Sequence, residues 1–163
     1  MLSYPVIASF PTAAPPSAVW GAFAAVERWP EVIPDLGYAR IEPPGPLETG
    51  AIIRASAGPA NAPVGIEYRV TRAEPPHRLT LETDTLEWNG RTDYTIDADG
   101  SGSVLHVVST MDVIGTLLRV QMFVVGRRMT EQRTEALRAR TKAMLVLAER
   151  IAAEEKTTLP SRS

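Results

Sequence analysis

Five side chains with hydroxyl, phenol or carboxyl groups are spaced so that they share one face of a β-sheet. Successive residues of a strand point to opposite faces, and the charged residues between these five fall on the other face. A few polar groups in an apolar surrounding are typical of a site that orients a small molecule by hydrogen bonds. We therefore predict a ligand site that includes Tyr68, Thr83, Thr85, Glu87 and Tyr94.

Glu87 is the only carboxylic acid among the five. A buried carboxyl group has a raised pKa, because desolvation disfavours its charged form, and it can then act as a general acid or base. In the alternative interpretation, Glu87 lies at the rim of a cavity, where it is solvated or paired with an arginine. We expect the rim position.

A second group of candidate ligand contacts lies in the C-terminal third of the chain. Met122, Met129 and Arg133 fall on approximately one face of a long predicted helix. Methionine fits varied apolar shapes, and an arginine can pair with a carboxylate of a ligand or of the protein. We expect these three to lie near the cavity mouth, whereas Met144 to Ile151 should pack as ordinary core. Gly126 marks either a kink or the close approach of another backbone segment.

Other chemistries find little support in the sequence. His77 and His106 have no ligand partner at helical or strand spacing, so no metal site is predicted. His106 is expected on the outer face of its strand, although the opposite register is left open. The chain has no cysteine, no nucleophile elbow and no phosphate-binding loop, and no cofactor is expected.

Length and composition fit one globular domain. The chain has 163 residues, of which 44% are apolar, and a net charge of −2. This charge leaves no basic stripe for nucleic acid, and no apolar run approaches the ~18 residues of a membrane span. The lack of cysteine fits a reducing cytosol, and the proline-interrupted N-terminus does not resemble a signal peptide. We expect a cytoplasmic domain over residues 1–155 and a disordered tail over 156–163, with a homodimer left open.

The order of predicted elements decides where the candidate residues lie. An apolar strand over Tyr4–Phe10 precedes a helix that starts at Pro15 and Pro16 and ends at Trp29-Pro30, with one more turn over 31–35. Six segments with period-two alternation follow, and a helix over residues 117–153 comes last. Short turns between the strands imply antiparallel pairing. The six strands are expected near residues 38–42, 51–57, 64–73, 79–88, 91–98 and 104–111.

Asn89-Gly90 gives the most specific expectation for the sheet. A two-residue Asn-Gly loop is typical of a type I′ hairpin turn, in which both central residues need φ > 0. In that hairpin Thr85 faces Tyr94, and Trp88 lies on the outer, charged face. The polar inner face would then point at the last helix.

This order of elements resembles the START-like, Bet v 1-like superfamily (SRPBCC), and within it the polyketide cyclase/dehydrase and lipid-transport group. The similarity extends over roughly residues 6–154 and rests on the proline-started helix, the Trp29-Pro30 break, the six strands and the long last helix. Three further segments match the group: Leu47-Glu48-Thr49-Gly50 before a strand, Glu74-Pro75-Pro76-His77-Arg78-Leu79 at a turn, and Gly100-Ser101-Gly102-Ser103 before the last strand.

The resemblance implies an α+β helix-grip fold. In this fold a seven-stranded, curved antiparallel sheet wraps around a long C-terminal helix, with two short helices between strands 1 and 2. It also implies a START-like ligand-binding domain with an elongated apolar cavity, and no catalytic residues carry over. We expect a carrier or sensor of a small hydrophobic ligand, either a lipid or an aromatic, polyketide-like molecule. The alternative is an aromatase/cyclase-type enzyme in which Tyr94, Glu87 or Arg133 moves protons. A third option is a protein partner on the outer face of the sheet.

Overall fold

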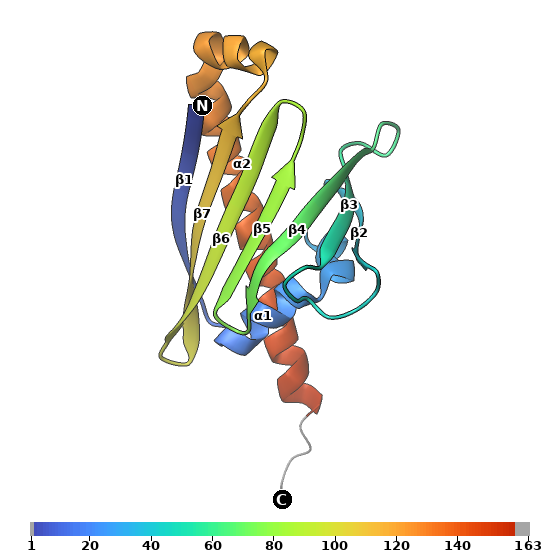
Figure 1. Ribbon diagram of the computed structural model, residues 1–163. Helices are drawn as coiled ribbons and strands as arrows, with labels where there is room; N and C mark the ends of the chain where they lie inside the picture. Colours follow the sequence, from blue (N-terminus) through green and yellow to red (C-terminus); the bar gives the residue numbers. More distant parts are fainter. Residues whose placement is uncertain (1, 159–163) are drawn as a thin grey trace, which may run out of the picture.

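One antiparallel sheet curves around one long helix in the computed structural model, which describes residues 2–158 (Figure 1). The seven strands lie in the order β1-β7-β6-β5-β4-β3-β2, and all neighbours are antiparallel. Two short helices connect β1 to β2, so the expected α+β helix-grip fold is confirmed. The elements are β1 (Leu2–Thr12), α1 (Pro16–Ala24), the 3-10 helix η1 (Val26–Glu31), β2 (Leu36–Glu42), β3 (Ile52–Ala57), β4 (Val64–Glu74), β5 (Arg78–Asp84), β6 (Trp88–Asp99), β7 (Gly102–Val113) and α2 (Thr116–Thr158).

The core lies between the inner face of the sheet and the two α-helices. Ile96, Leu105 and Val107 alternate inward from the central strands and are fully buried. Leu147 and Ala148 face them from α2 and are equally buried. The alternating pattern of the sequence thus corresponds to one buried sheet face, as expected for an antiparallel sheet with its other face in solvent.

The first helix ends earlier than the sequence predicted. α1 stops at Ala24, and Trp29-Pro30 lies inside η1 rather than at the end of α1. The Trp29 indole N–H donates a hydrogen bond of 3.0 Å to the carbonyl of Ala22, which folds η1 back against α1. The extra helical turn expected over residues 31–35 is thus η1, which ends at Glu31.

The hairpin between β5 and β6 also differs from its prediction. Asn89 and Gly90 lie within β6, and the turn is formed by Thr85, Leu86 and Glu87. The Thr85 hydroxyl donates to the carbonyl of Trp88 (2.7 Å) and accepts from the backbone N–H of Trp88 (3.0 Å). Hydroxyl-to-backbone bonding of this kind stabilises a turn without a left-handed residue, so it replaces the Asn-Gly signal.

Gly90 is required for packing rather than for a turn. Its φ is not in the left-handed region, but a Cβ at this position would lie 2.7 Å from the ring of Trp88. The register places Leu79 opposite Tyr94, where the sequence predicted Thr85, which is a shift of six positions. Because six is even, the inward and outward faces of both strands stay as predicted.

Helix α2 changes direction after its first turns. These turns, drawn in orange, lie across the top of Figure 1, and the remainder runs down behind the sheet. A Cβ at Gly126 would contact only the side chain of Met122, at 3.6 Å, so close backbone approach does not explain this glycine. Thr130 and Thr134 donate their hydroxyls to carbonyls four residues earlier, a pattern that often bends helices. These observations favour the kink.

The last turns of α2 extend beyond their predicted end. Lys156 to Thr158 are helical, although the sequence suggested a tail from Lys156, and residues 159–163 lie outside the described part. Within residues 2–158, no helix is both long and apolar enough to cross a membrane.

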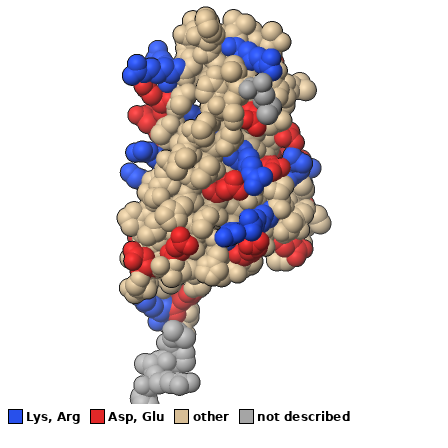
Figure 2. Space-filling model, turned by 60° about the vertical axis from the view of Figure 1, so that its left-hand side comes forward, with Lys and Arg blue, Asp and Glu red and all other residues tan. Residues whose placement is uncertain are grey.

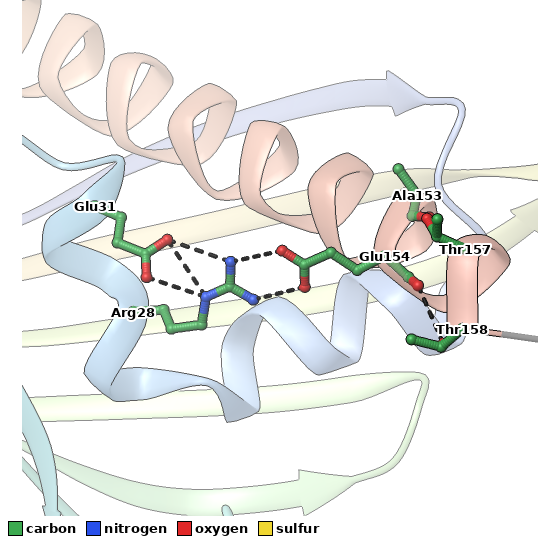
Figure 3. A network of polar contacts seen from close by, with 6 residues as sticks. All are labelled: Arg28, Glu31, Ala153, Glu154, Thr157 and Thr158. Atoms are coloured by element: carbon green, nitrogen blue, oxygen red, sulfur yellow. Dashed lines mark hydrogen bonds and ion pairs between the residues drawn. The ribbon is translucent and has the colours of Figure 1, made fainter.

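Arg28 connects η1 to the end of α2 (Figure 3). Its two terminal nitrogens each donate a bond of 3.0 Å to the carboxylate of Glu154, and its Nε donates to Glu31 at 3.2 Å. The hydrogen bond from Arg28 holds the pKa of Glu154 below its usual value. This bidentate geometry is the favourable form of an arginine–carboxylate pair.

Replacing Arg28 with methionine is expected to lower the thermal midpoint slightly at pH 7 and to have less effect at pH 3. A carboxyl group whose pKa is lowered by folding stabilises the folded state above its unfolded pKa, and this contribution is lost as pH falls through the folded pKa. Thermal melts of both proteins at the two pH values measure the difference. An equal effect at both values would mean that Arg28 acts through packing of its methylene groups and not through the ion pair.

Candidate ligand cavity

A cavity of about 360 Å³ lies between the inner face of the sheet, the α1–η1 region and α2. Its volume falls within the range of small-molecule sites. The wall is mainly aliphatic and aromatic, with a few hydroxyl groups. The lining residues are Phe23, Trp29, Ile33, Leu36, Ala55, Tyr68, Leu81, Thr83, Trp88, Gly90, Thr92, Tyr94, Ser109, Thr110, Met111, Arg133, Ala136, Leu137, Arg140, Thr141 and Met144.

The sheet contributes most of the polar part of the wall, through side chains that point inward from its strands. Tyr68 of β4, Thr83 of β5 and Tyr94 of β6 all line the cavity, because each lies on the inward-facing side of its strand. The ring of Phe23, from α1, packs against the ring of Tyr94 with a centroid distance of 4.7 Å. Trp29 of η1 completes this end, so the two short helices wall the cavity as well as covering the core.

Four of the eight predicted site residues line this cavity. They are Tyr68, Thr83, Tyr94 and Arg133. The other four, which are Thr85, Glu87, Met122 and Met129, are not among the lining residues.

Thr85 and Glu87 lie in the β5–β6 turn instead of on a strand. The backbone carbonyl of Glu87 accepts hydrogen bonds of 2.9 Å from the N–H groups of Ile114 and Gly115. Its carboxylate accepts a longer one, 3.5 Å, from the N–H of Leu118 in the first turn of α2. A carboxylate is favourable at this position, because the N-terminus of a helix carries partial positive charge. Glu87 therefore caps a helix and has no contact with the cavity.

The methionines of α2 are placed differently from the prediction. Met122 lies in the turns that cross the end of the sheet, and the cavity-lining part of α2 begins at Arg133. That part extends to Met144, which is buried in the core, as the sequence predicted, and also lines the cavity. The change of direction in α2 is the reason, since it takes the first turns away from the inner face of the sheet.

Arg133 and Arg140 are the charged side chains among the lining residues. Arg133 donates to the backbone carbonyl of Tyr4 and, at 3.1 Å, to the hydroxyl of Ser109. Burial lowers the pKa of Arg133. Neither arginine lies within ion-pair distance of a carboxylate in residues 2–158. The cavity thus presents positive charge to whatever occupies it.

Tyr94 is a partly buried phenol in the wall of the cavity. Burial raises its pKa, the nearby Tyr68 adds to this shift, and Arg140 opposes it. At neutral pH the phenol is therefore protonated, so it can donate a hydrogen bond but cannot serve as a base.

Several lining residues were missed by sequence reasoning. Trp88 was assigned to the outer face because the turn was misplaced, although in β6 it falls on the inner side with Gly90. Arg140 follows Arg133 by seven residues, about two helical turns, so the two share a face of the helix. That spacing was the available signal for a second cation in the cavity.

His106 lies on the outer face of the sheet, as expected, and away from the cavity. Its Nδ1 is 2.7 Å from the hydroxyl of Ser9, and its Nε2 is 3.2 Å from a carboxylate oxygen of Asp97. These three side chains form an exposed cross-strand row. In residues 2–158 no group of three or more His, Cys, Asp or Glu side chains is arranged to hold a metal ion.

Solved structures with this fold have several functions. The chain is similar to the di-domain ARO/CYC StfQ of the steffimycin biosynthetic pathway, with a TM-score of 0.75, 14% identity, 96% of this chain covered and 53% of the other. It is also similar to the Zhui aromatase/cyclase of a Streptomyces species, with a TM-score of 0.69, 16% identity, 91% of this chain covered and 95% of the other. A START superfamily protein of Mycobacterium smegmatis is similar too, with a TM-score of 0.69, 14% identity, 91% of this chain covered and 99% of the other. At these identities the likeness shows the fold alone.

Among curated proteins, none matches the chain in sequence. The sequence profile of one family, described as polyketide cyclase / dehydrase and lipid transport, matches residues 6–144. This match extends from β1 into the cavity-lining part of α2 and so includes the described lining residues. The chain therefore belongs to the polyketide cyclase / dehydrase and lipid transport family.

Proposed function

We propose that the protein is a carrier or sensor of a small hydrophobic ligand that bears an acidic group. The observation that supports this proposal is an apolar cavity of about 360 Å³ whose charged lining groups are two arginines. Neither arginine forms an ion pair with a carboxylate of residues 2–158. Burial of apolar ligand surface contributes roughly 25 cal/mol per Å². Tyr68, Thr83 and Tyr94 supply hydrogen bonds that orient the ligand.

The acidic group follows from the cost of buried charge. A guanidinium removed from water is unfavourable unless an anion or several acceptors compensate it. This cost applies to Arg133, which is partly buried and has two neutral acceptors, in Tyr4 and Ser109. Arg140 lines the cavity but is exposed to solvent, and no described carboxylate pairs with it. A ligand carboxylate, sulfonate or phosphate between the two arginines would provide the missing compensation. A purely apolar ligand would leave the partly buried charge of Arg133 without an anionic partner.

Two fluorescent probes that differ by one charged group test this function. We expect the protein to bind anilinonaphthalene sulfonate, and Arg140→Met to weaken that binding about tenfold, since hydrogen bonds to charged groups contribute ~1.5–3 kcal/mol. Binding of the uncharged N-phenylnaphthylamine should remain nearly unchanged in the same variant. Fluorescence titration measures both affinities.

Arg138→Met is the matched control, because Arg138 is exposed on the same helix, like Arg140, but does not line the cavity. It should leave both affinities unchanged. If the wild type binds neither probe, ligand binding in this cavity is refuted. If Arg140→Met lowers the affinity for both probes equally, the preference for an acidic ligand is refuted.

A second candidate function, that of an aromatase/cyclase-type enzyme, is favoured by the environment of Tyr94. Its protonated phenol can donate to a carbonyl oxygen, and Arg140 can stabilise an enolate that forms there. Tyr94→Phe is then expected to abolish turnover of a poly-β-ketone substrate while its binding is retained. Product analysis after incubation, together with a binding titration, distinguishes the two functions. Absence of turnover in the wild type would refute the enzyme function and leave only the carrier function.

A further inference from the structure

The first turns of α2 and the tip of the β5–β6 turn form an exposed apolar surface at one end of the molecule. We call it the end patch, and we define it by Leu86, Leu117, Val120, Phe123, Val124 and Val125. Phe123 is 93% exposed and Leu86 is 94% exposed, which is unusual for side chains of this size. Large exposed apolar side chains that gather at one end of a molecule are typical of an interaction site.

The two parts of the end patch are held together by backbone hydrogen bonds. The carbonyl of Glu87 accepts from Ile114 and Gly115, so the turn that carries Leu86 is fixed beside the start of α2. A Cβ at Gly115 would clash with the carboxylate of Glu87, which shows how closely these segments approach. The patch is therefore a formed surface made of two segments.

The helix in the end patch is apolar on both of its sides. Leu118 and Met122, one turn apart, are partly and fully buried against the body of the protein. Leu117, Val120 and Val124 follow one another at three- and four-residue spacing on the opposite, exposed side. A helix that is hydrophobic all round is normally buried, so the exposed side is built to be covered.

The charges around the end patch identify what covers it. Arg119, Arg127 and Arg128 are exposed in the same turns, and no acidic residue occurs from 113 to 130. In the turn that carries Leu86, the two acidic side chains are engaged: the Glu87 carboxylate accepts from the N–H of Leu118, and Asp84 pairs with Arg69. Asp112 and Glu131 flank this segment, and Glu131 pairs with Arg127 at 3.4 Å, both side chains being open to solvent. Figure 2 shows the top end of the molecule as apolar and basic, with the first acidic atoms below it. This arrangement contrasts with the net charge of −2 of the whole chain.

We propose that the end patch docks on an anionic lipid surface. An exposed helix with aromatic and aliphatic side chains and neighbouring arginines lies in the membrane interface, with its apolar side among the acyl chains and its arginines at the headgroups. A second copy of the chain fits less well, because a symmetric contact would bring two sets of arginines together. Trp88 and Met111, which line the cavity, belong to the strand ends beside the patch, so docking would bring the cavity close to the lipid.

Vesicle flotation tests this proposal without knowledge of the cavity's ligand. The wild type is expected to bind vesicles of phosphatidylcholine with phosphatidylglycerol, to bind pure phosphatidylcholine vesicles weakly, and to dissociate as salt is added. Phe123→Gln should reduce the partition coefficient on the order of tenfold, through loss of buried apolar area. Arg127→Gln combined with Arg128→Gln should reduce it about 25-fold, which is about fivefold for each charge.

Ile7→Gln is the matched control, since Ile7 is 72% exposed in β1 and lies outside the end patch. It should bind vesicles like the wild type, and circular dichroism should show all variants folded. Failure of the wild type to bind anionic vesicles would overturn the proposal. Unchanged binding by Phe123→Gln would also overturn it, as would light scattering that shows a dimer which this substitution dissociates.

Discussion

Leu147→Ala is expected to lower the free energy of unfolding by about 3 kcal/mol, within the 2–5 kcal/mol typical of buried Leu→Ala substitutions. Leu147 is completely buried in the part of α2 that packs on the sheet, next to the equally buried Ala148. Truncation removes apolar surface and leaves a void, which a curved sheet gripping a long helix can close only in part. Urea unfolding followed by circular dichroism measures the loss.

Val146→Ala is the control, because Val146 precedes Leu147 in the same helix but is 45% exposed. Its effect should stay within about 0.5 kcal/mol. A loss below 1 kcal/mol for Leu147→Ala would mean that α2 is held to the sheet mainly by contacts at other positions.

Thr83→Phe is expected to reduce the affinity for a polycyclic probe on the order of a hundredfold. Thr83 lines the cavity from β5, and the larger ring would occupy the space that the probe needs. Displacement of roughly 100 Å² of apolar contact corresponds to about 2.5 kcal/mol of binding free energy. Phenylalanine is compatible with a strand, so the sheet should form normally. Fluorescence titration with N-phenylnaphthylamine measures the change.

Thr95→Phe provides the same substitution on the opposite face. Thr95 of β6 lies opposite His106, on the outer side of the sheet, and does not line the cavity. Its probe affinity should equal that of the wild type. If Thr83→Phe retains full affinity while its thermal midpoint is normal, the probe binds elsewhere on the protein.

The turn between β5 and β6 shows how far local sequence signals extend. Asn89-Gly90 is a strong hairpin signal, yet the chain turns at Thr85, where the hydroxyl bonds to the backbone around Trp88. Packing of the Trp88 ring over Gly90 competes with the turn preference of the same dipeptide. The faces of the strands were nevertheless predicted correctly, because the error in register is an even number of residues.

Helix α2 shows a similar limit. Its existence and approximate end follow from periodicity, but the cavity-lining stretch runs from Arg133 to Met144, later than expected. Periodicity describes which residues share a face of a straight helix. It carries no information on where the helix changes direction or which part of its face meets a cavity.

The sequence by itself determined the element order, the inward face of the sheet and the presence of Tyr68, Thr83 and Tyr94 on that face, and the family resemblance implied the helix-grip architecture. These properties depend on alternation and on proline and glycine positions, which act over a few residues. The tertiary structure decided that Glu87 caps α2 instead of entering the cavity, that Trp88 and Arg140 line it, and that Phe123 is exposed. Each of these outcomes depends on contacts between residues far apart in the chain, and the free energy of those contacts is absent from any local pattern.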